Sequence, residues 1–173
     1  LAVDKTGTLT TNRMAVVELE KAKAKFTAEG AGECPEAFHP LVEFALLATP
    51  CDPFDPMEKA IQRFGHHWLA GTERVHHGRE PAFEYALSGE VLAMTRVFAS
   101  AHPAHTAQAA QYLLATKGAP EAVADLCHLP AEALAAVQRQ VEAMAERGLR
   151  VLAVARGHWN CPATSPDIEP PWP

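Results

Sequence analysis

The chain has 173 residues, of which 48% are hydrophobic and 21% are charged, and its formal net charge is -6 at pH 7. These values fit a globular protein with one sizeable core and exclude fibrous and disordered classes. The acidic balance argues against a broad basic surface for nucleic acid. No apolar run approaches the roughly 20 residues that cross a bilayer, so we expect these residues to stay in water.

Strands and a helix are predicted in the first third of the chain. Residues 14–26, MAVVELEKAKAKF, combine a β-rich run with polar alternation and predict one or two strands. Residues 38–49 place apolar side chains at helical spacing. Proline and aspartate residues then interrupt the chain.

A second helix is predicted to start at Asp55, because an aspartate can cap a helix and Pro56 suits the first helical position. Glu58, three residues after Asp55, completes a box-like capping pattern. Residues 68–81 are rich in His and Gly and predict a loop.

The second half of the chain predicts a sheet and two helices. Residues 81–88, 93–100 and 110–118 read as three antiparallel strands, with a polar hairpin connection before the last. A short helix over 119–129 and a long amphipathic helix over 130–148 follow, and Gly148 is placed to end the latter. Residues 149–157 predict a buried strand. The fold class is therefore α+β, a mainly antiparallel sheet covered by helices.

Two cysteine and histidine patterns point away from metal. Four cysteines, Cys34, Cys51, Cys127 and Cys161, are scattered without a close pair, so they predict reduced thiols. The adjacent pairs at 66–67 and 76–77 cannot both face one metal as readily as histidines four apart on a helix. A surface loop is the preferred interpretation of these histidines, and core packing is the preferred interpretation of the long amphipathic helix.

The opening residues carry the strongest chemical motif. In DKTGTLT, residues 4–10, Asp4 follows an apolar strand-like run and precedes Lys5, Thr6 and Gly7. A carboxylate can attack the terminal phosphate of ATP to form an acyl phosphate, which divides one hard transfer into two easier steps. This chemistry needs a nearby cation, hydroxyl groups and a glycine that lets the backbone approach phosphate and metal.

The motif closely resembles the phosphorylation site of the P-type cation-transporting ATPases. Three further strings resemble that family in the same order: DPMEKA at 55–60, TKGAPEAV at 116–123 and GLRVLAVA at 148–155. DPMEKA is similar to the calcium-pump branch, of bacterial type. The resemblance implies the ATP-binding domain of a cation pump, a cytoplasmic part of an integral membrane protein, with ATP and Mg²⁺ as ligands.

The resemblance also implies boundaries and partners. Residues 1–12 would be a remnant of the phosphorylation domain and hinge, 13–157 the nucleotide-binding domain, and 158–173 a proline-rich tail or return linker. We expect a fragment of a larger pump, monomeric by itself, that works with the phosphorylation, actuator and membrane domains. The intact pump would hydrolyse ATP through an aspartyl-phosphate on Asp4, while the fragment alone would not be catalytically competent.

Each site residue implied by the resemblance has a structural alternative. Lys117 would lie beside the nucleotide as a compact charge, but a lysine before a Gly turn is also common at the surface. Gly118 would let the backbone approach the ligand.

Glu58 would hydrogen bond toward the adenine, although its spacing from Asp55 also serves a cap. Arg150 would contact the polyphosphate, since an arginine in an apolar strand needs a partner or an exit to water. With the phosphorylation domain complete, Asp4 and Thr6 would hold Mg²⁺.

The segment EYALSGEVLAMTRV departs from the calcium-pump pattern. Ungapped alignment puts Leu87 where that branch has an adenine-stacking Phe, and Leu92 where it has a Lys. Loss of a stacking ring costs on the order of 1–3 kcal/mol, so we expect roughly millimolar ATP binding, equivalent to about -4 kcal/mol. Alternation predicts that Phe83 and Tyr85 lie on the same side of the strand as Leu87.

Two alternatives stay open at this point. The first is a degenerate module of the same fold that has weak or lost ATP binding and acts in regulation or interaction, as Leu87 and Leu92 indicate. The second is a phosphatase of the haloacid-dehalogenase group. That group typically has a second acid two residues after the nucleophile, where this chain has Thr6.

Overall fold

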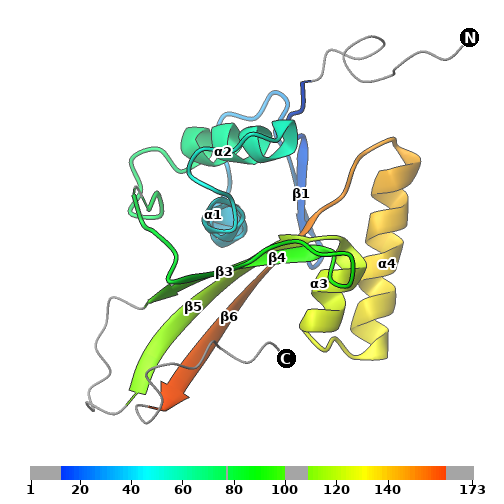
Figure 1. Cartoon of the computed structure of the whole chain (residues 1–173). Helices are drawn as coiled ribbons and strands as arrows, with labels where there is room; N and C mark the ends of the chain where they lie inside the picture. Colours follow the sequence, from blue (N-terminus) through cyan, green and yellow to red (C-terminus); the bar gives the residue numbers. More distant parts are fainter. Residues whose placement is uncertain (1–12, 77, 100–108, 163–173) are drawn as a thin grey trace, which may run out of the picture. The chain divides into compact units, whose positions relative to one another are not determined.

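The computed structural model describes residues 13–76, 78–99 and 109–162 (Figure 1). Its contacts divide the chain into two compact units, one up to Gly78 and the other from Arg79 onward. We describe each unit by itself.

The first unit begins with a two-stranded antiparallel hairpin, β1 (Glu18–Lys21) and β2 (Ala24–Thr27). A 3-10 turn, η1 (Glu36–Phe38), leads into helix α1 (His39–Leu47), and helix α2 (Pro56–Trp68) follows. These elements confirm the predicted strands and both predicted helices of the first third of the chain.

Aromatic and aliphatic side chains from all these elements form the core of the first unit. Phe26 of β2 packs edge-on against Trp68 at the end of α2, with ring centroids 5.5 Å apart, and against Phe38 at 5.9 Å. Val42 and Leu69 complete the buried cluster, together with the Cys34 side chain. A two-stranded hairpin this short is marginally stable by itself. Its packing against the helices therefore stabilises it.

The second unit is built on a four-stranded antiparallel sheet of order β3-β4-β5-β6. The strands are β3 (Phe83–Tyr85), β4 (Ala93–Ala99), β5 (Ala109–Gly118) and β6 (Ala153–Pro162). The three predicted strands and their antiparallel pairing are thus confirmed, and so is the α+β class. The predicted hairpin connection between β4 and β5 lies outside the described residues.

The two central strands are closely paired. Thr95 and Thr116 face each other across β4 and β5, and their Oγ1 atoms share a buried hydrogen bond of 2.7 Å. Tyr112 stacks on Trp159 of β6 with ring centroids 5.4 Å apart. Cross-strand pairs of this kind fix the register, because a slip of one residue would turn every side chain to the other face.

Helices α3 (Pro120–Leu126) and α4 (Ala131–Glu146) lie between β5 and β6 in the sequence. α3 contacts both of those strands and α4, and Figure 1 shows the two helices side by side. α4 ends at Glu146, and Gly148 follows two residues later at the position predicted to end the helix. Gly148 has a φ of 77° and donates its N–H to the Ala145 carbonyl at 2.8 Å.

The apolar stripe of α4 departs from the expectation of simple core packing. Leu134, Val137, Val141 and Met144 are each half-buried, and α4 has no fully buried residue. The helix therefore gains less from burial than a core helix, and α3 is its main packing partner.

Candidate functional site

One end of the sheet brings several of the predicted site residues together. β5 ends at Gly118, which pairs with Ala93 at the start of β4 and with Ala153 at the start of β6. β3 runs antiparallel to β4, so it also ends on this side. The register therefore brings the segment 86–92, the end of β5 and the residues just before β6 to the same end of the sheet.

Lys117 lies next to this end, within the sheet. Its register partners are Met94 on β4 and Val154 on β6. Directly opposed residues in an antiparallel ladder point to the same face, so these three side chains are neighbours. Lys117 is only 5% exposed, which contradicts the solvated-lysine alternative.

Gly118 has a structural reason to be glycine. A Cβ added there would overlap the Leu92 carbonyl oxygen and lie 2.5 Å from the Cα of Ala93. The next residue, Ala119, donates its N–H to the same Leu92 carbonyl at 2.9 Å. Close approach of β4 and β5 therefore demands a glycine at this position, whatever the ligand.

Leu87 lies in the loop after β3, and its side chain is 63% exposed. Leu92, just before β4, is also exposed. The predicted strand over residues 81–88 is shorter than expected, because β3 ends at Tyr85. Alternation therefore does not determine whether Phe83 and Tyr85 lie on the same side as Leu87. The Phe83 ring packs against Tyr112, with centroids 6.3 Å apart.

Arg150 is not part of a strand, and that expectation too is wrong. β6 starts three residues later, at Ala153, and continues past the predicted end at Gly157 to Pro162, because the ten residues of β5 offer it partners throughout. Arg150 is exposed. Its charge therefore has the exit to water that an arginine in an apolar segment requires.

Glu58 belongs to the first unit, in the first turn of α2. Asp55 caps this helix as predicted: its Oδ1 accepts the N–H groups of Met57 at 2.8 Å and Glu58 at 3.3 Å. The Glu58 side chain is half-buried and takes part in a further interaction. An acid in the first turn also suits the helix dipole. The role of Glu58 toward adenine stays a prediction.

The predicted catalytic residues Asp4, Lys5 and Thr6 lie outside the described residues, as does the magnesium site predicted at Asp4 and Thr6. Among the residues that are described, no group of three or more His, Cys, Asp or Glu side chains is arranged to hold a metal ion.

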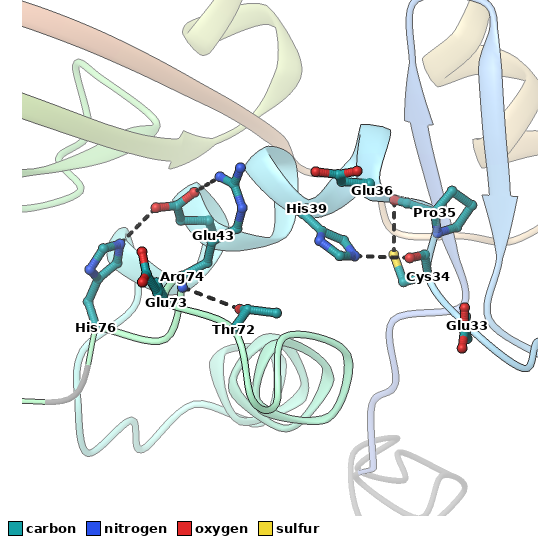
Figure 2. Close-up of a pocket in the computed structure, with 10 residues that line it drawn as sticks. All are labelled: Glu33, Cys34, Pro35, Glu36, His39, Glu43, Thr72, Glu73, Arg74 and His76. Atoms are coloured by element: carbon teal, nitrogen blue, oxygen red, sulfur yellow. Dashed lines mark hydrogen bonds and ion pairs between the residues drawn. The ribbon is translucent and has the colours of Figure 1, made fainter.

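A hollow of about 890 Å³ in the first unit is lined by two separate groups of polar contacts, one around Glu43 and one around His39 (Figure 2). Glu43 on α1 accepts from Arg74 Nη1 at 2.5 Å and lies 2.7 Å from His76 Nε2. His39 Nε2 lies 2.9 Å from the Cys34 carbonyl oxygen. Both carboxylate oxygens of Glu43 are engaged, so its contacts fasten the segment 72–76 to α1 rather than offering charge to a ligand. His76 is thus a hydrogen-bonding partner of Glu43 and not simply a surface-loop residue.

The surroundings of two cysteines change the pKa of their thiols. Burial raises the pKa of the Cys34 thiol, and desolvation likewise raises the pKa of the Cys127 thiol. The raised pKa keeps both thiols mainly protonated at neutral pH, and burial also limits access to Cys34. Cys34, Cys51 and Cys127 are free cysteines.

Sequence reasoning missed a second hollow, near the start of α2. It is lined by Phe54, Lys59 and Arg63 among others. One feature of the sequence could have indicated this hollow. Phe54 is an aromatic residue among prolines and aspartates, which favour an exposed turn and leave its ring without apolar neighbours in the sequence.

The fold and the sheet end define an α+β domain that carries a buried lysine at the end of a central strand. A sequence model of the family described as "P-type ATPase, cytoplasmic domain N" matches residues 55–166, from the cap of α2 to beyond β6. The chain therefore belongs to this family. A search among curated proteins found no match.

Membership gives the chain a general role. Domain N of a P-type ATPase is the cytoplasmic nucleotide-binding part of an ATP-driven pump, and such domains bind ATP. None of the helices in the described part of the chain is both long and apolar enough to span a membrane.

Proposed function

We propose that this domain holds ATP at the end of the four-stranded sheet and presents its terminal phosphate to Asp4 in an intact, calcium-pump-like cation ATPase. The observation that carries the proposal is topological. Leu87 follows β3, Lys117 and Gly118 end β5, and Arg150 precedes β6, so the register of the sheet brings the three segments that carry these residues to one end of it.

Each residue has a distinct part in the proposed site. Lys117 contributes a positioned ammonium, and the exposed Arg150 contacts the polyphosphate as a planar donor fork. Leu87 covers one face of the adenine. The resemblance implies that Glu58, which belongs to the first unit, accepts a hydrogen bond from the adenine amino group, and this role stays a prediction. None of these residues does covalent chemistry; they position the nucleotide.

The remaining steps belong to the intact pump. Hinge closure would bring the bound ATP in line with Asp4, which attacks as the nucleophile while Lys5 and Thr6 stabilise the charge. Mg²⁺, with Asp4 and Thr6 among its ligands, would neutralise the phosphate oxygens. The phosphorylation, actuator and membrane domains supply the rest of the cycle.

The test is an NMR titration of the isotope-labelled chain with ATP, with and without Mg²⁺, to about 10 mM nucleotide, near the expected millimolar affinity. We expect saturable amide shifts at Leu87, Lys117 and Gly118. Leu87→Phe would restore a stacking ring and tighten binding about tenfold. The matched control is Val17→Phe, which adds a ring at an exposed position of the first unit.

The competing interpretation is a degenerate module that no longer binds ATP. The exposed leucines at 87 and 92 favour it, because they replace a ring and a cation. A folded chain that shows no shifts at the sheet end, and gains none with Leu87→Phe, would refute our proposal and support this alternative.

A further inference from the structure

A separate hollow of about 320 Å³ lies in the first unit beside the start of α2. The described residues that line it are Arg13, Met14, Phe54, Pro56, Lys59 and Arg63. We call it the α2 basic pocket. Pro56, Lys59 and Arg63 are spaced by three and four along the helix, so they share one face. Glu58, one residue before Lys59, points about 100° away around the helix.

The α2 basic pocket concentrates positive charge in an acidic chain. Three of its described lining residues are cations and none is an acid, whereas the whole chain has a net charge of -6. The Asp55 carboxylate, which adjoins Phe54 and Pro56 in sequence, is engaged in capping α2. Arg63 donates from Nη2 to the Met14 carbonyl at 3.0 Å, which fixes its position. Like charges around one hollow repel each other, and an anion would relieve that repulsion.

Phe54 adds an aromatic surface to this charge. Its side chain is 93% exposed, which is unusual for a large apolar residue. The Lys59 ammonium lies 5.5 Å from the ring centroid, within the range of a cation–π contact. Since little of the ring is covered, a flat ligand can stack on it. Proteins that bind single-stranded nucleic acids combine the same two features, aromatic rings on which bases stack and cations along the phosphates.

We propose that the α2 basic pocket is an accessory nucleotide site, distinct from the site at the sheet end. Phosphate groups lie against Arg13, Lys59 and Arg63, and the base stacks on Phe54. The volume is at the lower end of the range for small-molecule sites. An open site of this size suits a phosphorylated nucleoside whose base is held on one face.

The experiment compares two probes on the full labelled chain, ATP and inorganic tripolyphosphate, which has the phosphates without the base. We expect both to produce saturable amide shifts at Arg13, Phe54, Lys59 and Arg63. Glu58 is left out of this readout, because the function proposed above assigns it to the other nucleotide site. Lys59→Gln should weaken both probes at least threefold, because it removes a phosphate contact. Phe54→Ala should weaken ATP about tenfold and leave tripolyphosphate nearly unchanged. Lys23→Gln, in the exposed turn between β1 and β2, is the matched charge control.

The outcomes separate the parts of the proposal. If neither probe shifts Arg13, Phe54, Lys59 and Arg63, or if Lys59→Gln has no more effect than Lys23→Gln, the pocket is not a phosphate site and the proposal fails. If Phe54→Ala leaves ATP binding unchanged, base stacking is refuted. Shifts at Lys117 and Gly118 are read in the same spectra, so the sheet-end site and the α2 basic pocket can fail independently.

Discussion

Arg96 Nε lies 3.1 Å from Glu84 Oε2, and the two residues face each other directly across the ladder of β3 and β4. The Arg96 side chain is 8% exposed and that of Glu84 is 42% exposed. The guanidinium also lies 5.6 Å from the Phe98 ring centroid. The largely buried Arg96 is thus paired in part with the more exposed Glu84. This ion pair helps to hold the short strand β3 to the sheet.

Removing this acid should destabilise the second unit. Glu84→Gln takes away a charged acceptor from Arg96, and charge-assisted hydrogen bonds contribute about 1.5–3 kcal/mol. Solvent screening at the half-exposed Glu84 reduces this to about 1 kcal/mol. Urea unfolding followed by circular dichroism measures the change. Glu80→Gln, at an exposed position, is the control, and an equal loss in both variants would contradict the role of the ion pair.

Gly118 should tolerate no side chain. In Gly118→Ala the new Cβ overlaps the backbone of β4, and relief by strand movement should cost about 1–3 kcal/mol in the free energy of unfolding. The matched control is Gly89→Ala, where an added Cβ has nothing within 4 Å. That variant should be neutral or slightly stabilising, because alanine reduces the freedom of the unfolded chain. Similar unfolding midpoints for the two variants would refute the packing argument.

The cap of α2 should be replaceable by another capping residue. Asp55→Ala removes the acceptor of two N–H groups and should lower the free energy of unfolding by about 1 kcal/mol. Asp55→Ser keeps an acceptor oxygen and should recover most of this loss. Thermal unfolding of the three proteins provides the measurement. If serine and alanine destabilise equally, then the carboxylate acts through charge and not as a cap.

The Cys34 thiol should make stability depend on alkaline pH. Burial raises its pKa in the folded chain, so above the ordinary value of about 8.5 the unfolded chain holds fewer protons than the folded one. Folding stability therefore falls as pH rises through that region. We expect the loss between pH 7.5 and 9.5 to be smaller in Cys34→Ala than in the natural sequence. Equal losses would mean that Cys34 does not contribute.

Cys34 should also react slowly. At pH 8, iodoacetamide should alkylate the exposed Cys51 well before the buried Cys34, since the thiolate is the reactive form and access is limited. Peptide mass spectrometry over a time course measures both rates. Comparable rates would indicate that the segment around Cys34 opens readily.

Much of the fold could be predicted from local signals. The cap and proline at 55–56 located α2, Gly148 located the end of α4, and β-rich runs between turn residues located β3 to β5. Strand ends were harder to predict, because they depend on partners distant in the sequence. β6 extends to Pro162 because β5 provides hydrogen-bonding partners along its whole length. No residue near position 157 indicates that the strand continues.

The sequence allowed us to predict which residues belong to the candidate site, but not their burial or their neighbours. The register that brings Lys117 next to Met94 is a long-range property, and so is the burial of the Lys117 side chain. The exposure of Arg150 followed from a strand that starts later than its apolar sequence indicated. The α2 basic pocket was missed because Arg13 is separated from Lys59 and Arg63 by more than 40 residues.

The burial of Lys117 has a consequence for the entropy of binding. A lysine side chain loses about 1.5–2 kcal/mol of rotamer freedom when it is ordered. In Lys117 most of that loss accompanies folding, since its side chain is 5% exposed before any ligand arrives. Arg150, in contrast, keeps its freedom until contact. A nucleotide at the sheet end would therefore meet one cation already in place and restrain a second, so changes at Arg150 should alter the entropy of binding more than those at Lys117.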